Sequence, residues 1–338
     1  RMWALWAALG ILSGSAISQE KGLEIHWIDV EGGAATLVVS PEGESLLMDC
    51  GWPGERDAER IAQAVRAAGR SRIDHFLTSH WHVDHWGGLE ELARRIPIGR
   101  FYDHGFPEGS PRDIDPKLKE AYLRVTGGKS VVLGPGDEVP FKGARVRILS
   151  AHGRVLGEPA GAPQIRPCPA NPEHPVRPED TSDNARSLGF VLEFRGFRFL
   201  DLGDLTWNVE HKLVCPADLV GRVDVYQVTH HGLDISNHPA LLGAAAPTVA
   251  VVNNGARKGG SAETYRRLRA VPELKDVFQV HRNVATGPPD NAPSGFVAND
   301  GERCDGAGIR LAVDPSGKAY TVEVPSKGTR RTYATKAR

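Results

Sequence analysis

The chain has 338 residues, 40% of them hydrophobic, which is enough to bury a substantial core in one large domain or two small ones and excludes intrinsic disorder. Its 41 basic and 42 acidic side chains give a formal net charge of −1, so the chain has no global electrostatic attraction to nucleic acid or to anionic membranes. A polyanionic substrate would have to be held locally, by metal ions.

Residues 1–18 have the pattern of a secretory signal peptide, with a positive start, an apolar run over residues 2–12 and a tail of small residues. The run is too short to span a bilayer, which takes about 20 apolar residues; an uncleaved N-terminal anchor is the alternative. We therefore expect one domain, residues 19–338, exported to the periplasm or the outside of the cell. No stable membrane insertion is expected after signal removal, and no partner protein is evident.

The next elements alternate in type. Apolar residues recur with period two or in short runs at residues 23–27, 35–39 and 45–48, which predicts three strands of an antiparallel meander. Helical spacing of apolar residues over 58–68 predicts an amphipathic helix that Asp57 caps and Gly69 ends. Residues 73–78 then predict a buried strand, and residues 87–95 a helix.

The same strand pattern recurs along the rest of the chain, at residues 144–149, 188–194, 197–200, 223–229, 248–252 and 277–280, with helices expected at 209–213 and 261–270. Two irregular stretches are expected to be long loops, residues 157–183 and 283–308. The order of elements indicates two similar αβ halves packed sheet against sheet, with helices outside.

Potential metal ligands cluster directly after the strand at 73–78, in the sequence Ser-His-Trp-His-Val-Asp-His. The 13 histidines predict about 0.23 per six-residue window, whereas residues 80–85 hold three and a carboxylate. His80 and His82 leave the strand two positions apart and can face one ion, while Asp84 and His85, on the following turn, can face a second. Imidazole and carboxylate are the usual ligands of catalytic zinc.

A two-metal site needs a bridging ligand and a further donor from elsewhere in the chain. Asp204 ends a strand in a Gly-Asp pair, and His230 and His231 end the strand predicted at 223–229, so these residues are the candidates. The predicted cofactors are two divalent ions, zinc in the first place, with manganese or iron as alternatives.

At this point the chain resembles the metallo-β-lactamase fold superfamily, whose H-x-H-x-D-H motif is intact at residues 80–85. The resemblance covers about residues 23–281 and implies an α/β fold, the αβ/βα four-layer sandwich, with a dinuclear metal site at the sheet edges. It implies that Asp49 orders the metal loop without binding metal. It also implies that Asp204 is the bridge and that His230 or His231 is the last histidine ligand.

Within the superfamily the chain is most similar to the hydrolase domain of the ComEC/Rec2 competence proteins. The similarity rests on residues 29–35, 84–88 and 184–188, on Gly203-Asp204 and on His230-His231-Gly232. It implies hydrolysis of nucleic-acid phosphodiesters by a free-standing, exported relative. Other superfamily members cleave lactones, lactams, thioesters and other esters with the same core.

Some assignments stay open. The superfamily commonly has a third-motif histidine after the strand here at 144–149, which would be His152; if His152 does not bind, Asp183 or solvent completes the first site. His281 ends another strand and is either a substrate contact or a packed residue. Trp52, Trp81 and Trp86 either wall the pocket or belong to the core.

The four cysteines, Cys50, Cys168, Cys215 and Cys304, lack the short paired spacing of a structural zinc site. In an exported chain they can form disulfides, and because Cys168 and Cys304 each lie in a predicted loop, we expect these two to pair. Cys50, at a strand end, is expected to be a small buried residue.

These features predict a dinuclear metallohydrolase, zinc-dependent in the first place, in which a metal-bridging hydroxide attacks a phosphodiester of a small molecule or a nucleic acid. Asp84 would orient the nucleophile, and whichever of His230 and His231 is not a ligand would, when protonated, assist the leaving group. The alternatives are a hydrolase of a lactone, β-lactam or other ester, and a non-catalytic metal-binding module. Redox diiron chemistry is disfavoured because diiron members have a carboxylate where this chain has His82.

Overall fold

The structure is a computed structural model that describes residues 21–107, 113–157 and 174–337 of the chain. The predicted signal peptide lies outside these residues, as does most of the predicted loop 157–183. No helix in the described part of the chain is long and apolar enough to cross a membrane.

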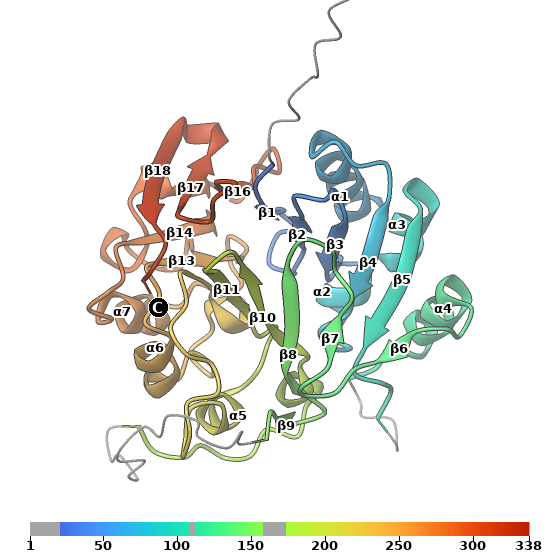
Figure 1. Cartoon of the computed structure of the whole chain (residues 1–338), viewed down its shortest axis with the longest axis horizontal. Helices are drawn as coiled ribbons and strands as arrows, with labels where there is room; N and C mark the ends of the chain where they lie inside the picture. The colour runs from blue at the N-terminus through green and yellow to red at the C-terminus, as the bar shows by residue number, and fades with distance from the viewer. Residues whose placement is uncertain (1–20, 108–112, 158–173, 338) are drawn as a thin grey trace, which may run out of the picture.

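The first sheet has nine strands in the order β18-β17-β16-β1-β2-β3-β4-β5-β6 (Figure 1). Neighbours from β1 to β3 pair antiparallel, and those from β3 to β6 run parallel. The three C-terminal strands were not predicted; they extend the sheet by antiparallel pairing of β16 with β1. The bounds are β1 (Glu24–Trp27), β2 (Thr36–Val39), β3 (Ser45–Met48), β4 (Ile73–Leu77), β5 (Ile98–Asp103), β6 (Val131–Val132), β16 (Ile309–Val313), β17 (Ala319–Val324) and β18 (Thr329–Ala334).

The second sheet runs in the order β15-β14-β13-β12-β11-β10-β8-β7, with β9 paired to β8. The strands from β11 to β15 are parallel, so their carboxyl ends lie at one edge. The bounds are β7 (Glu138–Val139), β8 (Arg145–Ala151), β9 (Arg154–Val155), β10 (Gly189–Phe194), β11 (Phe197–Asp201), β12 (Val225–Gln227), β13 (Val249–Val252), β14 (Asp276–His281) and β15 (Val297–Asn299).

Helices cover the outer face of each sheet. Figure 1 shows α1, α3 and α4 on one side of the molecule and α5, α6 and α7 on the other. The helix bounds are α1 (Glu55–Ala67), α2 (Val83–Trp86), α3 (Leu89–Arg95), α4 (Pro116–Thr126), α5 (Trp207–Lys212), α6 (Pro239–Ala245) and α7 (Ala262–Arg269), with 3₁₀ turns η1 (Asp183–Arg186), η2 (Thr229–Gly232), η3 (Pro288–Asp290), η4 (Ser294–Phe296) and η5 (Pro325–Lys327).

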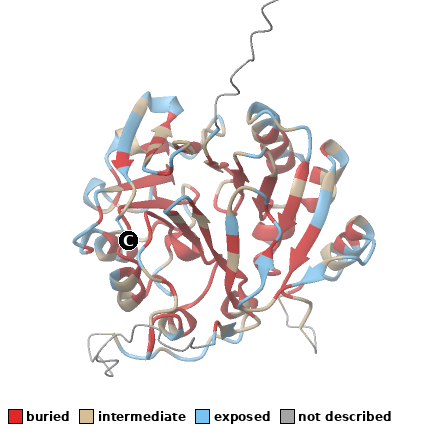
Figure 2. Cartoon of the chain, viewed as in Figure 1, coloured by how far each residue is buried: buried red, intermediate tan, exposed pale blue. Residues whose placement is uncertain are grey.

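Three apolar clusters hold these layers together. The largest lies between the sheets and includes Trp27 and Phe199, whose rings meet edge to face at 5.8 Å between centroids. One further cluster joins each sheet to its helices, and Figure 2 shows the buried residues concentrated in the strands. The predicted four-layer αβ/βα sandwich is therefore confirmed.

Some local predictions differ from the structure. Asp57 does not cap α1: the helix begins at Glu55, and the buried Asp57 carboxylate accepts a hydrogen bond from the Trp52 amide at 2.9 Å. Residues 283–308 are not irregular throughout, because this stretch contains β15.

The predicted disulfide between Cys168 and Cys304 is wrong. Cys304 is a free thiol, and so is the buried Cys50, whereas Cys215 is in a disulfide. Cys168 itself lies outside the described residues. Cys304 instead lies within 3.1 Å of a carboxylate oxygen of Asp29.

Candidate metal centre

The loop after β4 is held in place by Asp49, which follows β3. One Asp49 oxygen accepts the Ser79 amide at 2.7 Å, and the other accepts the Ser79 hydroxyl at 2.6 Å and Nδ1 of His85 at 2.8 Å. Both of its carboxylate oxygens are therefore used within the protein. These contacts are those expected of a residue that orders the metal loop without binding metal.

Two groups of ligand atoms meet at the carboxyl ends of the parallel strands. In the first, Oδ2 of Asp204 lies 3.9 Å from Nε2 of His80 and 3.2 Å from Nε2 of His85. In the second, Oδ2 of Asp84 lies 3.3 Å from Nε2 of both His85 and His231. His85 belongs to both groups, so the two lie side by side. All five residues are buried.

Asp204 is the most central of these residues. Besides His80 and His85, its Oδ2 lies 3.4 Å from Nε2 of His230 and 3.4 Å from Nε2 of His231. One carboxylate oxygen thus faces four imidazoles. This is the placement expected of a ligand between two ions.

The hydrogen bonds of the histidines show that the set fits metal ions. Nδ1 of His231 lies 3.0 Å from the Asn253 carbonyl oxygen, and Nδ1 of His85 lies beside the Asp49 carboxylate. Both oxygens can only accept a hydrogen bond, so both ring nitrogens donate one. His230 Nδ1 faces the Ser236 hydroxyl at 3.1 Å, and that hydroxyl donates to the Leu205 carbonyl, so it accepts from the ring.

By the same argument His80 donates Nδ1–H to the Ser79 hydroxyl at 3.0 Å, because that hydroxyl donates to Asp49. All four rings, when neutral, therefore point an Nε2 lone pair into the centre. Nε2 of His80 is buried and makes no hydrogen bond to a described residue. Such a set of nitrogen and carboxylate donors fits zinc.

Charge in the centre is divided among the ligands. Burial disfavours the charged imidazoles of His85 and His231, but the nearby Asp204 outweighs it and raises the pKa of both rings, so a metal ion would have to displace their protons. Burial, followed by the nearby His85, holds the pKa of His80 well below its usual value, which keeps its lone pair free. Burial favours protonated Asp204, but His231, His85 and His230 outweigh it and hold the pKa of that carboxyl well below its usual range. Metal ligands need these forms, a neutral imidazole and an ionised carboxylate.

Backbone geometry places the last two histidines. His230 and His231 lie in η2, directly after β12, with φ of 57° and 53°, a region that non-glycine residues rarely adopt. Gly259 packs so closely against this turn that a Cβ there would lie 2.2 Å from the His231 carbonyl oxygen. His231 joins the group with Asp84 and His85, whereas His230 contacts Asp204 and, at 3.5 Å, the Asn184 amide.

Two predicted ligands are not brought into these groups. The His82 ring lies 4.7 Å from that of His80, but its Nε2 faces Asp113 at 3.7 Å. His152 packs against His104, with ring centroids 5.7 Å apart. Neither is part of a three-ligand group among the described residues, and both stay predictions as ligands.

Asp183, the alternative to His152, supports the loop. Its Oδ2 accepts the Trp81 amide at 2.7 Å and Nε2 of His104 at 3.0 Å, and its Oδ1 makes no hydrogen bond to a described residue. Trp81 and Trp86 are buried core residues, with ring centroids 4.8 Å apart.

Sequence reasoning missed Lys258, which lies in the loop between β13 and α7. Its ammonium group contacts Oδ2 of Asp84 and lies 5.0 Å from the centroid of the Trp52 ring. The side chain is 35% exposed, so a cation stands at the border between the buried ligands and solvent. The only sequence signal is its position, six residues after the end of a buried strand.

Comparison with known proteins agrees with this geometry. Residues 28–154 match the family model of the metallo-beta-lactamase superfamily. This part of the chain is therefore similar to a superfamily that consists mostly of hydrolases, and the chain has the metallo-beta-lactamase fold.

Three curated relatives represent the range of similar proteins. Recombination protein 2 of Haemophilus influenzae is 25% identical over 69% of this chain and 24% of its own length. Ribonuclease Z of Methanopyrus kandleri is 32% identical over 35% of this chain and 39% of its own. An atrochrysone carboxyl ACP thioesterase of Cryptosporiopsis sp. is 28% identical over 38% of this chain and 41% of its own. The chain thus spans less than half the length of each of these relatives.

Proposed function

We propose that this chain is a hydrolase with a dinuclear metal centre, zinc in the first place, that acts on phosphodiesters. The observation that carries the proposal is the convergence of four Nε2 lone pairs, from His80, His85, His230 and His231, on the carboxylate of Asp204. Asp84 supplies a second carboxylate to the same centre. When bound there, two divalent cations would lower the pKa of water to about 7 and stabilise developing negative charge.

The residues of the chain have distinct roles in this proposal. Asp204 lies between the two groups and would serve both ions through its carboxylate, whereas His85, with only its Nε2 lone pair free, would be a ligand of one ion. His80 and His231 would complete the two positions. Asp84 orients the attacking water through its carboxylate. His230 is assigned to ligation and not to protonation of the leaving group, because burial lowers its pKa to about 4 and leaves it neutral at pH 7.

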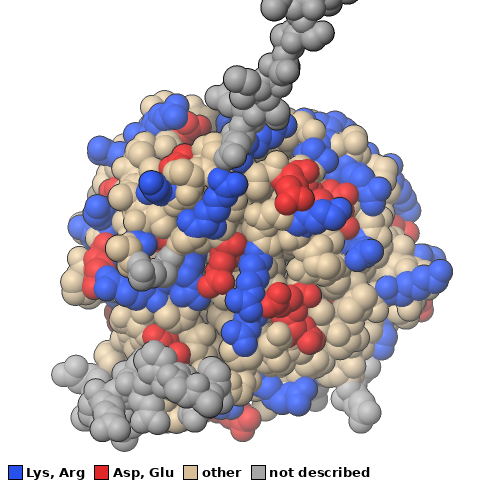
Figure 3. All heavy atoms as spheres, in the orientation of Figure 1, with Lys and Arg blue, Asp and Glu red and all other residues tan. Residues whose placement is uncertain are grey.

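A phosphodiester substrate is supported by the similarity to the ComEC/Rec2 hydrolase domain and by the relative named ribonuclease Z. Basic and acidic side chains are interspersed over the face seen in Figure 3. A polyanionic substrate would therefore be attracted there by individual cationic groups and not by the charge of the whole face. Lys258 beside Asp84 supplies a local cation. Acyl substrates are the second candidate, supported by the thioesterase relative.

The proposal is tested with the purified full chain loaded with Zn²⁺ or Mn²⁺, assayed on bis-(p-nitrophenyl) phosphate, DNA, a lactone and a β-lactam. We expect turnover of the phosphodiesters, and loss of it in the double variant Asp84→Ala/His85→Ala with an unchanged circular dichroism spectrum. The matched control is Glu120→Ala/Arg124→Ala on the exposed face of α4. Turnover of the lactone or lactam alone would favour the second candidate. Two bound metals without any hydrolysis would favour a non-catalytic module.

Export is the remaining part of the proposal, and it is supported by the signal-peptide pattern of residues 1–18. Expression with these residues should place the protein outside the cytoplasm with its N-terminus near Gln19. N-terminal sequencing of the exported fraction measures this. Retention in the cytoplasm would remove this part of the proposal and leave the hydrolase assignment intact.

A further inference from the structure

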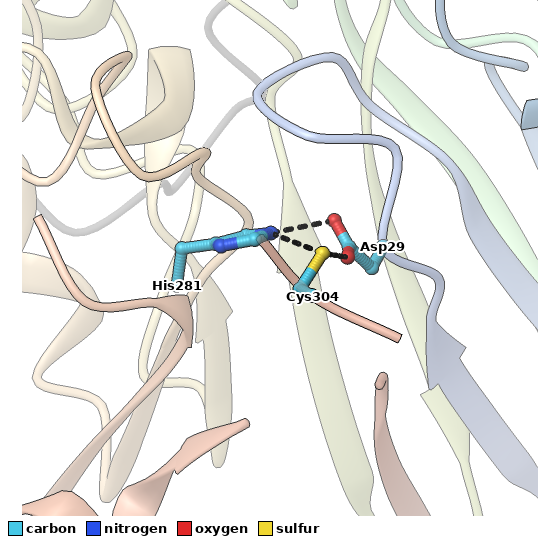
Figure 4. A group of neighbouring side chains, drawn as sticks. All are labelled: Asp29, His281 and Cys304. Atoms are coloured by element: carbon cyan, nitrogen blue, oxygen red, sulfur yellow. Dashed lines mark hydrogen bonds and ion pairs between the residues drawn. The ribbon is translucent and has the colours of Figure 1, made fainter. Parts of the chain in front are cut away.

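A second group of potential ligands lies apart from the candidate metal centre, where three distant segments meet (Figure 4). Asp29 follows β1, His281 is the last residue of β14, and Cys304 lies in the loop between β15 and β16. We call these three residues the Cys304 cluster. Asp29 and His281 are fully buried, and Cys304 is partly exposed.

The three ligand atoms point toward one another in Figure 4. Oδ1 of Asp29 lies 2.8 Å from Nε2 of His281, and its Oδ2 lies 3.1 Å from Sγ of Cys304. Sγ and Nε2 are 3.9 Å apart. A carboxylate, an imidazole and a thiol thus share one small volume.

This geometry is not that of a nucleophilic cysteine. In a catalytic triad the histidine uses one ring nitrogen for the nucleophile and the other for the carboxylate, but here Nε2 of His281 faces both partners. Nδ1 of His281 is buried and makes no hydrogen bond to a described residue. Burial and the adjacent Asp29 raise the pKa of Cys304 to about 11, so the free thiol is protonated at neutral pH.

The distances suit a tetrahedral ion. Zinc takes sulfur at about 2.3 Å and nitrogen or oxygen at about 2.0–2.2 Å, which separates ligand atoms by about 3.3–3.6 Å. The observed separations of 2.8, 3.1 and 3.9 Å lie on either side of these values. Small side-chain adjustments would place all three atoms around one ion.

Neighbouring charges and access are also suitable. Arg60 contacts the cluster directly, with Nη1 3.4 Å from Oδ2 of Asp29 and Nη2 3.9 Å from Sγ of Cys304. Arg56 and Arg60 are together offset by Glu31, at 2.8 and 3.2 Å, and by Asp57, at 2.7 Å from Arg56, so the charge left for an ion is that of Asp29 and a Cys304 thiolate. Those two charges balance a divalent cation. Oε1 of Glu31 also lies 3.8 Å from Sγ of Cys304, within reach as a fourth ligand. Cys304 is itself partly exposed, and its neighbour Arg60 lines a cavity of about 670 Å³.

We propose that Asp29, His281 and Cys304 bind one divalent cation of the zinc type, with Glu31 or water as the fourth ligand, at a structural site separate from the candidate metal centre. On binding, the Cys304 thiol releases its proton to solvent and a sulfur–metal bond forms. The ion would tie together the carboxyl end of β14 and the loop after β1. That loop reaches the candidate metal centre, because the Ala34 amide donates to the Asp84 carbonyl at 3.1 Å.

The test uses Co²⁺ as the probe in a full-length His85→Ala/Asp204→Ala background, which removes a ligand from both groups of the candidate metal centre. We expect a near-ultraviolet thiolate-to-cobalt charge-transfer band. Cys304→Ser, which changes one atom, should abolish the band, and Cys50→Ala, which removes the other free thiol, should retain it. A band that survives Cys304→Ser, or Co²⁺ titration that yields none in the parent, would overturn the proposal.

A second measurement uses zinc alone. In the same background, excess Zn²⁺ should slow the reaction of Cys304 with a thiol reagent at least tenfold, with Cys50→Ala isolating that thiol. Equal rates with and without Zn²⁺ would overturn the proposal. Cys304→Ser in the otherwise unaltered chain should keep hydrolysis, so loss of this site and failure of the proposed function give different results.

Discussion

The two halves of the sandwich bring ligands to the same place in different ways. The first sheet contributes His80, Asp84 and His85 through one continuous segment after β4, which runs into α2. The second contributes residues from separate strand ends, Asp204 after β11 and the histidine pair after β12. In a continuous segment, one supporting residue can position all the ligands. When ligands come from separate strand ends, their relative positions depend on the parallel pairing of the strands.

The residues that support the ligand-bearing segments also differ between the two halves. In the first half, Asp49 is hydrogen-bonded directly to a predicted ligand, His85. In the second, Glu210 of α5 is fully buried and accepts the His238 amide at 2.8 Å, at the end of the segment that carries His230 and His231. Glu210 forms no ion pair with a described residue, and burial raises its pKa to about 7. The second half should therefore be the pH-sensitive one.

The largest effect is expected where the two halves meet. Asp204→Ala removes the oxygen that faces histidines from both sheets, so we expect kcat/KM to fall by about 10³-fold or more, with loss of bound metal. Activity and metal content by mass spectrometry measure this. Asp234→Ala, an exposed aspartate in the loop after η2, is the control. Normal metal content and activity in Asp204→Ala would show that the halves do not share a ligand.

A large effect on stability is expected from Glu210. Its folded-state pKa of about 7 lies above the ordinary 4.5, so the fold binds the proton more tightly than the unfolded chain. The stabilisation from this proton is complete below about pH 4.5 and is lost as pH rises through about 7, a change of about 3 kcal/mol. Glu210→Gln should remove most of this pH dependence.

Urea unfolding between pH 5 and about pH 8 measures that difference. Glu120→Gln, at an exposed position of α4, is the matched control and should follow the parent curve. Parallel curves for Glu210→Gln and the parent would mean that Glu210 titrates normally. The pH sensitivity of the second half would then rest on Asp201 at the end of β11, whose pKa burial raises to about 7.

A smaller effect is expected from Asp49, the supporting residue of the first half. Asp49→Asn replaces one accepting oxygen by an amide donor that faces Ser79 or His85, so we expect metal affinity to fall about 10- to 100-fold. Competition with a chromophoric chelator measures this. Asp74→Asn, on β4 of the same sheet, is the comparison, because its carboxylate bonds Ser45 and not a predicted ligand. Unchanged metal affinity in Asp49→Asn would show that the segment after β4 keeps its shape without the hydrogen bonds of the Asp49 carboxylate.

The same contrast explains what the sequence could predict. The first-half ligands form one dense motif, and the positions of Asp204, His230 and His231 at strand ends are enough to mark them as candidates from the sequence alone. Lys258 carries no such motif, because its place beside Asp84 depends on how the loop after β13 folds back on the other half.

The Cys304 cluster could not be predicted, for a related reason. Asp29 and His281 are 252 positions apart, and Cys304 lies a further 23 along, so no spacing rule joins them. The loop position of Cys304 suggests a disulfide with Cys168, whereas pairing of β15 with β14 and of β16 with β1 brings it to His281 and Asp29. The order of the layers can be predicted because it follows from the local periodicity of apolar residues. Contacts between strand ends of different sheets depend on tertiary packing, so they cannot be predicted in this way.

The smallest effect is expected from Lys258, and it tests whether the second half also contributes to substrate binding. With Asp84 engaged by metal, the ammonium of Lys258 would be free to meet an anionic substrate at the edge of the site. Lys258→Ala should lower kcat/KM for a phosphodiester about tenfold, leave a neutral lactone unaffected and keep metal affinity unchanged. Lys258→Arg should restore part of the loss, and Arg257→Ala, whose side chain is 70% exposed and pairs with Glu302, should have little effect. Equal losses on charged and neutral substrates would instead assign Lys258 to the support of Asp84, and the second half would then contribute ligands alone.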